Sequence, residues 1–458
     1  TFLVNSEIRQ KIKKIKKISK KYNLEKQNDL IKKLEFKLTN DQKKTLDEIN
    51  NDLSSSNKMF RLLQGDVGSG KTIVSFLAAY NTVNAGFQVA VMAPTEILAR
   101  QHFNFAKKLF PKNLDIELIS GKSDYKTKKD VLDKLVNKKL DIIFGTHAIF
   151  QKKVSFKNLG LIIIDEQHKF GVNQRKRLSD KGGDNCDVLL MTATPIPRTL
   201  TMTMYGDMDL SIISEKPKSR KSIKTYSKLE DKIQEVIKFI KKEIELGNQI
   251  FWVCPLIEES KKLDHSSAVK KFEYLEKIFP GQVSLLHGKT DIEDKEKILN
   301  KFLKNDFKIL VSTTIIEVGI DFPNANVIII ENANKFGLSQ LHQLRGRVGR
   351  GDKESTCILM FKSNLSQNAK KRINILKESN DGFYISEEDM KIRGFGDILG
   401  FKQSGVKNFK LADPIHNSDL FLLAEKEMKR IEIANEDISK FKPLMKLYDR
   451  ADIINDIA

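Results

Sequence analysis

The sequence predicts an α/β protein with two tandem domains, each built on a parallel β-sheet, followed by a helical C-terminal region. Apolar runs of strand length alternate with helix-length polar segments between residues 62 and 213, and the same alternation returns between residues 229 and 362. This pattern is typical of βαβ units whose sheet is covered on both faces. The length of 458 residues also exceeds what one hydrophobic core organises, which favours more than one domain.

The expected domain boundaries follow from where the helical and strand-like patterns begin and end along the chain. Residues 1–33 place isoleucines at helical spacing among many lysines, which predicts a basic helical segment or linker packed on a neighbouring domain. Direct contact of this segment with DNA is the alternative. The remaining expected segments are a first sheet domain at 34–213, a basic linker at 214–224, a second sheet domain at 225–362, and a helical hairpin, a loop and further helices at 363–458.

Charge and composition favour some classes of partner and site and disfavour others. Lys and Arg number 80 against 60 Asp and Glu, and the net charge of +20 favours a polyanionic partner such as nucleic acid. The alternative is that lysine merely fills free surface positions. Three widely spaced cysteines support neither a zinc site nor a disulfide framework. The apolar runs are far shorter than the roughly 20 residues of a membrane span, so we expect a cytoplasmic protein with no membrane partner.

The stretch "LLQGDVGSGKT", residues 62–72, predicts a triphosphate-binding loop. It is a strand-like run that ends in glycines and leads into a helix-like segment, and its spacing matches the Walker A pattern. Backbone N–H groups of such a loop cradle phosphates, while a lysine reaches the outer phosphates and a threonine ligates Mg²⁺. The candidate nucleotide-binding residues are Gly65, Asp66, Gly68, Ser69, Gly70, Lys71 and Thr72, and the last of these is also a candidate metal ligand.

A second acidic motif follows about ninety residues later, where "LIIIDEQH" ends a strand-like run with Asp165 and Glu166. A carboxylate at such a strand end can hold Mg²⁺, and its neighbour can polarise the attacking water. We therefore expect Asp165 to be a metal ligand and Glu166 to be the water activator.

An arginine cluster, "QLRGRVGRG", lies far from the phosphate loop in the sequence. It contains Gln343, Arg345, Arg347 and Arg350. A solvated basic face is the simplest interpretation of such a cluster. The alternative is an arginine finger, which stabilises transition-state charge and is worth roughly 10³ to 10⁵ in rate. We take Gln343, Arg347 and Arg350 as candidate catalytic residues, so that hydrolysis would depend on closure of the two domains.

Other loops follow strand-like runs and offer groups that could grip a nucleic-acid backbone without reading bases. The segments "MAPTEILARQH" and "FGTHAIF" supply these candidates, and "MTATPIPRTL" could link the nucleotide and polymer sites. The residues are Thr95, Arg100, Thr146, His147, Thr192 and Thr194.

Taken together, the motifs resemble those of superfamily 2 helicases and, more narrowly, those of the RecG family of ATP-dependent DNA helicases. The matching segments are "GDVGSGKT", "APTEILARQH", "DEQHKFG", "TATPIPRTL", "TTIIEVGIDFPNA" and "QLHQLRGRVGRG". The resemblance covers residues 34 to at least 414 and implies two RecA-like motor domains, use of ATP with Mg²⁺, and movement on duplex DNA. It further implies an adenine contact by Gln42 and nucleotide contacts by Gly319 and Asp321.

Three other functions are alternatives. A transcription-repair coupling factor shares the later region, but its Walker A loop usually has an aromatic residue where Ser69 stands, and "DEQH" also favours RecG. An RNA helicase is disfavoured because the C-terminal hairpin resembles that of duplex DNA translocases. An inactive, nucleotide-gated scaffold is disfavoured because the catalytic residue types are intact.

The stretch "NDGFYISEEDMKIRGFGDILGFKQSG" resembles the hairpin and loop that convert domain closure into a stroke along DNA. Its candidate contacts are Arg393, Lys402 and Gln403. Phe395 replaces the usual proline, and Phe401 with Lys402 replaces the usual Thr-Arg. A bidentate arginine contact thereby becomes a point-charge lysine contact. We therefore expect the coupling between domain closure and movement along DNA to be altered.

The resemblance also implies an N-terminal region with a wedge that splits fork junctions. Only the basic segment precedes Leu34, so we expect that wedge to lie outside this chain. We expect the chain alone to act as a monomer, hydrolyse ATP and bind duplex, fork and branched DNA, but to regress forks poorly. A single-strand-binding protein is a candidate partner.

Overall fold

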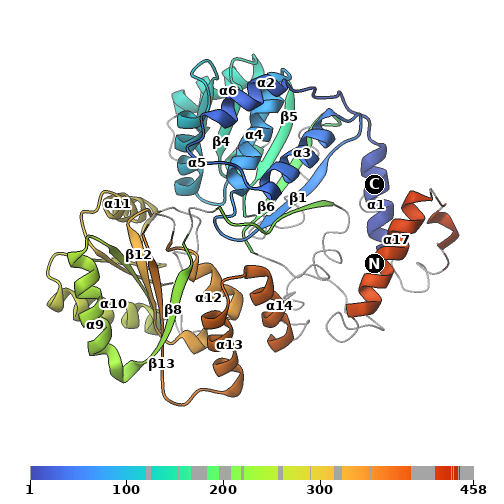
Figure 1. The fold of residues 1–458 in the computed structure, drawn as a ribbon. Coiled ribbons are helices and arrows are strands. Elements are labelled where there is room, and N and C mark those ends of the chain that lie inside the picture. Colours follow the sequence, from blue (N-terminus) through green and yellow to red (C-terminus); the bar gives the residue numbers. More distant parts are fainter. Residues whose placement is uncertain are drawn as a thin grey trace. The chain divides into compact units, whose positions relative to one another are not determined.

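The computed structural model describes residues 2–119, 125–151, 154–166, 183–194, 208–217, 221–255, 261–288, 290–313, 322–349, 353–393, 418–434, 436, 438–441 and 443. The chain divides into two compact units, one formed by Thr1–Glu215 with Arg393–Ala458 and the other by Lys216–Ile392. Each unit holds one parallel sheet flanked by helices (Figure 1), which confirms the predicted α/β fold class.

The first unit is built on a seven-stranded sheet in the order β3-β4-β2-β5-β6-β1-β7. Every pair of neighbouring strands is parallel, and β5, with the sequence LGLIII, is buried along its whole length. Such continuous apolar strands suit a sheet covered on both faces. The strands are β1 (Phe60–Gly65), β2 (Gln88–Met92), β3 (Ile116–Ile119), β4 (Ile142–Gly145), β5 (Leu159–Ile164), β6 (Asp187–Thr192) and β7 (Asp209–Ile213).

Alternate strand residues enter two separate cores, because successive side chains of a strand point to opposite faces. Leu63 belongs to the same hydrophobic core as Phe76, whereas Leu62 belongs with Val131 to the other core. The helices that this unit contributes are α1 (Phe2–Lys14), α2 (Leu24–Lys32), α3 (Asn40–Ser54), α4 (Lys71–Asn84), α5 (Glu96–Leu109), α6 (Tyr125–Val136), η1 (His147–Phe150), α17 (Ser418–Ile433) and η6 (Ile438–Phe441).

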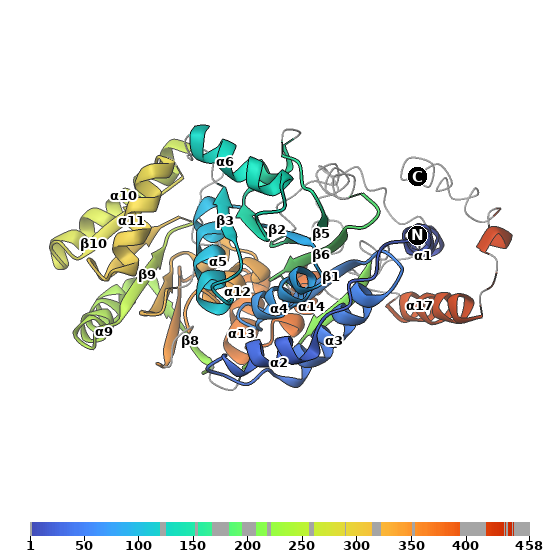
Figure 2. The same cartoon turned by 90° about the horizontal axis from the view of Figure 1, so that it is seen from above.

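The second unit repeats the plan with a six-stranded parallel sheet in the order β10-β11-β9-β12-β13-β8, and Figure 2 shows part of it from above. Its strands are β8 (Ile223–Leu229), β9 (Gln249–Val253), β10 (Val283–Leu286), β11 (Ile309–Ser312), β12 (Ala325–Ile330) and β13 (Ser355–Phe361). Its helices are η3 (Glu230–Lys232), α9 (Ile233–Glu245), α10 (Lys261–Ile278), α11 (Ile292–Leu303), η5 (Ala333–Lys335), α12 (Leu338–Arg345), α13 (Gln367–Glu378) and α14 (Gly382–Arg393).

The basic N-terminal segment, predicted to be helical or a linker, is helical only in part, because α1 ends at Lys14. Residues beyond it run beside the connection between α3 and β1, where the backbone N–H of Lys17 donates to Ser56 O and that of Lys20 donates to Leu53 O. Ile18 is consequently 59% exposed. Tertiary contacts of the two lysines therefore take the place of helical hydrogen bonds after Lys14.

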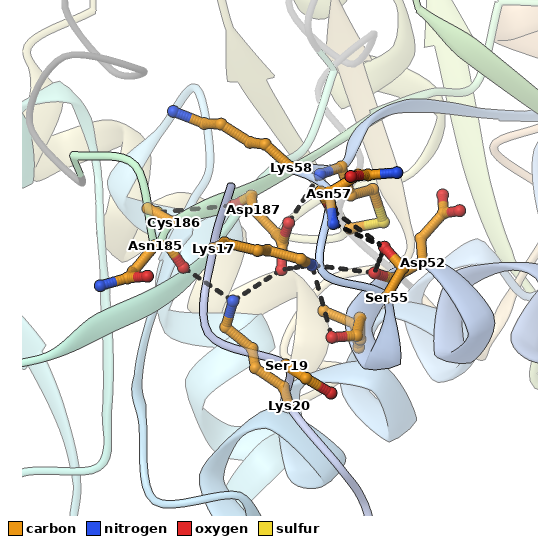
Figure 3. A network of polar contacts seen from close by, with 12 residues as sticks. Lys17, Ser19, Lys20, Asp52, Ser55, Asn57, Lys58, Asn185, Cys186 and Asp187 are labelled. Carbon is orange, nitrogen blue, oxygen red and sulfur yellow. Dashed lines mark hydrogen bonds and ion pairs between the residues drawn. The ribbon is translucent and has the colours of Figure 1, made fainter. Parts of the chain in front are cut away.

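Those contacts form a buried charge network around Asp187, the first residue of β6 (Figure 3). Asp187 Oδ2 accepts from Lys17 Nζ at 2.6 Å and from Lys20 Nζ at 2.7 Å, and Oδ1 accepts from Met59 N at 2.7 Å. All three charged side chains are fully buried. Buried charges of this kind require pairing and hydrogen bonds, and the network therefore fixes the N-terminal segment to the first sheet.

Among the described residues, no helix has the length and apolarity needed to cross a membrane.

Candidate nucleotide site

The carboxyl edge of the first sheet brings together most of the residues predicted to bind nucleotide or DNA. β1 ends at Gly65 and leads into the phosphate loop, β5 leads into Asp165, and β6 ends at Thr192. β2 and β4 lead to Thr95 and Thr146. Because carboxyl ends of parallel strands share one edge, these residues from distant parts of the sequence lie at one side of the sheet, where α/β proteins bind ligands.

The phosphate loop owes its shape to glycines. Gly68 has φ 76° and Gly70 has φ 87°, conformations that other residues adopt only at a cost. A Cβ on Gly70 would also collide with the Gln42 amide. Ser69 Oγ is buried and has no hydrogen-bond partner within the described part of the chain.

Lys71 begins helix α4 and points back over this loop. Its Nζ donates to Gly65 O at 2.7 Å and to Asp66 O at 2.9 Å. The ammonium group is therefore held at the turn itself, at the N-terminal end of α4, where the helix dipole favours an anion. An unsatisfied buried hydroxyl, a lysine and a helix N-terminus are the donor set that a polyphosphate requires.

Gln42 lies behind the loop. It forms a capping box with Thr39 at the start of α3, in which Gln42 Oε1 accepts from Thr39 N at 3.0 Å. Its Nε2 donates to Ser69 O at 2.8 Å, and the residue is 1% exposed. Gln42 thus supports the phosphate loop from behind, and an adenine contact by this residue stays a prediction.

Asp165 and Glu166 follow β5 and are almost fully buried, at 9% and 8% exposure. Burial on its own would raise the pKa of the Asp165 carboxyl. The hydrogen bond and charge of His102, followed by the charge of Lys71, outweigh burial and hold that pKa below its ordinary value. The carboxylate is thus kept ionised, the form that ligates a divalent cation.

Glu166 adopts φ 51°, an uncommon conformation for a residue with a side chain. Its Oε2 accepts from Ala193 N at 3.3 Å, and in the same turn Thr192 Oγ1 accepts from Thr194 N at 3.2 Å. Such strain costs on the order of 1–3 kcal/mol and clusters at functional sites. The bond to Ala193 joins the candidate water activator to the segment that was predicted to link nucleotide and polymer sites.

The residues present fit Mg²⁺ held together with a nucleotide. Thr72 in the first turn of α4 supplies a hydroxyl, and Asp165 supplies an ionised carboxylate. The described residues contain no group of three or more His, Cys, Asp or Glu side chains that could hold a metal by themselves.

The predicted backbone-gripping residues have varied environments. Thr95 is the N-cap of α5, where its side chain accepts from Leu98 N, and Arg100 on the same helix is exposed. Thr146 is 7% exposed and precedes η1, and Thr192 is fully buried. Among the side chains of this set that the structure describes, Arg100 is the exposed one, whereas Thr192 is shielded from solvent.

In the second unit, Gln343 lies on α12 and is half-buried, and Arg347 follows this helix and is 2% exposed. Arg345 has a structural role, because its Nη1 donates to Leu376 O at 2.6 Å and to Ser379 O at 2.9 Å. It thereby caps the carboxyl end of α13. The interpretation of this cluster as a solvated basic face is wrong for Arg345 and Arg347, since both are buried.

Two residues of note have no local sequence signal. His102 on α5 bonds Asp165, with His102 Nε2 and Asp165 Oδ2 2.9 Å apart. Asp389 on α14 accepts from both Ser339 N and Ser339 Oγ, at 3.2 and 2.6 Å. Each contact joins residues at least fifty positions apart, so only the tertiary structure reveals it.

Several predicted residues lie outside what the structure describes. They are Gly319, Asp321, Arg350, Lys402 and Gln403, together with Phe395 and Phe401, and for His147 and Arg393 the side chains are not described.

Three protein families match the chain in sequence. The DEAD/DEAH box helicase family matches residues 39–203, the helicase conserved C-terminal domain matches residues 231–352, and the C-terminal part of domain 3 of the ATP-dependent DNA helicase RecG matches residues 379–450.

Among curated proteins, the ATP-dependent DNA helicase RecG of Bacillus subtilis is 50% identical over 390 residues, which span 84% of this chain and 57% of that protein. The Thermotoga maritima protein of the same name is 47% identical over 408 residues, or 88% of this chain and 52% of its own length. The chain thus spans little more than half the length of these relatives.

Solved structures of helicases also resemble the chain. RecG bound to a three-way DNA junction superposes with a TM-score of 0.77 at 42% identity, over 92% of this chain and 55% of that one. Yeast Dbp5 bound to RNA and ADP BeF3 gives a TM-score of 0.57 at 19% identity, over 80% of this chain and 91% of that one, and shows likeness of fold alone.

Proposed function

Because the chain belongs to the RecG family of ATP-dependent DNA helicases, we propose that it is an ATP-driven motor that moves on duplex DNA and remodels stalled replication forks and recombination junctions. Mg²⁺ is its metal cofactor, and it works as a monomer in the bacterial cytosol or nucleoid. A single-strand-binding protein is a candidate partner.

One observation carries this proposal: the carboxyl edge of the first sheet holds a glycine-shaped loop with Lys71 bonded to it and, two strands away, the ionised Asp165 beside Glu166. This arrangement can bind a triphosphate and its cation and can polarise a water. The assigned roles are phosphate binding by Lys71, Mg²⁺ ligation by Thr72 and Asp165, and water activation by Glu166.

Residues of the second domain complete the site in this proposal. Arg347 and Arg350 neutralise charge that develops on the transferred phosphoryl group, and Gln343 helps to orient the reactants. Gly319 and Asp321 contact the nucleotide. A site divided between two domains would make hydrolysis depend on their closure, which is how a motor couples chemistry to movement.

DNA is held through its backbone, by Thr95, Arg100, Thr146 and His147 in the first domain and by the hairpin loop with Arg393, Lys402 and Gln403. The net charge of +20 supports this mode. Affinity should therefore be nearly independent of sequence and should fall with salt, by a log-log slope of about 0.9 for each phosphate neutralised.

The test is steady-state ATP hydrolysis by this chain with no nucleic acid, linear duplex DNA, a model fork and single-stranded RNA, at low and moderate salt. The Lys71→Ala variant is the negative control. We expect duplex and fork to stimulate hydrolysis alike and the RNA to have little effect, with the stimulation lost in the control.

Two results would contradict the proposal. Equal stimulation by RNA would favour an RNA helicase, and absence of hydrolysis under every condition would favour a nucleotide-gated scaffold. A separate gel assay measures fork regression by this chain.

A further inference from the structure

His102 joins the helix α5 to the candidate metal ligand Asp165. Its Nε2 lies 2.9 Å from Asp165 Oδ2, and the histidine is 6% exposed. The other carboxylate oxygen, Oδ1, accepts from Glu166 N at 2.9 Å. Both oxygens of Asp165 are therefore held, one by the adjoining backbone and one by a side chain sixty-three positions earlier in the chain.

Packing fixes the orientation of the His102 ring. Phe76 on α4 meets it edge-to-face, with ring centroids 5.9 Å apart. Phe76 in turn stacks on Phe105 of α5 at 5.6 Å and contacts Phe144 at 5.7 Å. Since the helix α4 begins at Lys71, the ring lies between the helix that starts at the phosphate loop and the strand end that carries Asp165. It has little freedom to turn away from the carboxylate.

A carboxylate that ligates a cation has to present a lone pair in one fixed direction, and groups bonded to it hold that direction before the cation arrives. We propose that His102 is a positioning residue for Asp165, which holds this carboxylate ready for the Mg²⁺ of the bound nucleotide. The inference rests on the proposed function, since it takes Asp165 as the metal ligand.

The helix α5 connects the His102–Asp165 contact with candidate DNA-binding residues. Thr95 caps the N-terminus of α5 and Arg100 is exposed on it, both predicted to contact the DNA backbone, and His102 follows half a turn later. One rigid helix thus carries the candidate DNA contacts at its start and the hydrogen bond to the metal ligand in its second turn.

The experiment measures binding of a fluorescent ATP analogue with excess Mg²⁺ and with EDTA, and takes the ratio of the two affinities. It compares wild type with His102→Leu, which keeps bulk but removes the hydrogen bond, and with His102→Gln, whose amide nitrogen can occupy the place of Nε2. Phe105→Leu is the matched control, because it disturbs the same aromatic cluster without touching Asp165. Thermal unfolding confirms that each variant is folded.

We expect His102→Leu to lower the ratio by about 10- to 100-fold, the usual effect of removing a residue that supports a metal ligand. Binding in EDTA should stay unchanged, His102→Gln should restore most of the ratio, and Phe105→Leu should leave it at the wild-type value. An unchanged ratio in His102→Leu, an equal loss in Phe105→Leu, or no rescue by glutamine would each overturn the proposal.

Failure of the proposed function appears in a different measurement. If duplex DNA does not stimulate wild-type hydrolysis, the motor assignment fails, while the ratio of nucleotide affinities still decides the role of His102.

Discussion

Asp389 of α14 accepts a hydrogen bond from Ser339 Oγ, 2.6 Å away at the start of α12, and a second one from Ser339 N. Arg345 at the other end of α12 caps α13. The helical hairpin formed by α13 and α14 is thus attached at both ends of the helix that carries Gln343. A shift of this helix would be passed to the hairpin.

Asp389→Ala should therefore weaken the link between hydrolysis and DNA. We expect basal ATP hydrolysis to persist while stimulation by duplex DNA falls, because leaving the Ser339 donors without their acceptor costs about 1–3 kcal/mol and leaves the fold intact. Glu387→Ala is the control, since Glu387 is an exposed residue of the same helix. Full stimulation in Asp389→Ala would show that the attachment does not transmit the coupling.

Gly70→Ala should abolish nucleotide binding. The φ of 87° costs a side-chain-bearing residue roughly 1–2 kcal/mol, and the new methyl group would also displace Gln42 from the loop. Gly247→Ala is matched in conformation, with φ 81° and no neighbouring atom within 4 Å, so it should lower stability slightly and leave binding unchanged. Titration with a fluorescent ATP analogue separates the two. Equal effects of both substitutions would mean that strain alone is responsible.

Glu166→Gln should bind ATP as wild type does and lose turnover by about 10²–10⁴-fold, the usual contribution of a general base. Arg350→Ala should likewise bind ATP and lose about 10³–10⁵-fold in turnover if it acts as an arginine finger. Single-turnover hydrolysis measured alongside equilibrium ATP binding tests the role of Glu166 as general base and that of Arg350 as arginine finger. Near-normal turnover in either variant would remove that residue from the catalytic set.

Asp187→Asn should destabilise the first unit by about 3–5 kcal/mol, since it leaves two buried ammonium groups without their counter-charge. Lys13→Met, which removes a half-exposed pair with Asp209, should cost at most about 1 kcal/mol. Urea unfolding followed by circular dichroism measures the loss. Fluorescence of Trp252, the one tryptophan of the chain, reports on the second unit and should be unaffected if the units unfold independently.

The cysteines should be unreactive in the folded protein. Burial, with the nearby charge of Asp187 adding to it, raises the pKa of Cys186 to about 12, and burial raises the pKa of Cys357 to about 12. Burial also raises the pKa of Cys254 well above its ordinary value. Because the thiolate is the nucleophile, iodoacetamide at pH 7 to 9 should modify none of the three until the chain is unfolded. Mass spectrometry counts the adducts, and rapid labelling of the native chain would contradict this prediction.

The strands and their ends could be predicted from sequence because a buried parallel strand needs a continuous apolar run, as LGLIII before Asp165 illustrates. The phosphate loop could be predicted because its glycines and lysine have fixed spacing. The end of α1 at Lys14 could not be predicted from sequence, because the pairing of Lys17 and Lys20 with Asp187 overrides the local helical pattern. The bonds of His102 and Asp389, and the φ of Glu166, depend on distant parts of the chain in the same way.

The pairing of Lys17 and Lys20 with Asp187 also has a mechanical meaning. Asp187 begins β6 and Thr192 ends it, so the two residues lie at opposite edges of the sheet, about 17 Å apart at the usual rise along a strand. Tension applied to the chain ahead of Lys17 is taken up by the stiff sheet at the edge remote from the phosphate loop. The first unit therefore has an anchor point at which it can be pulled without distorting the place where ATP would be split.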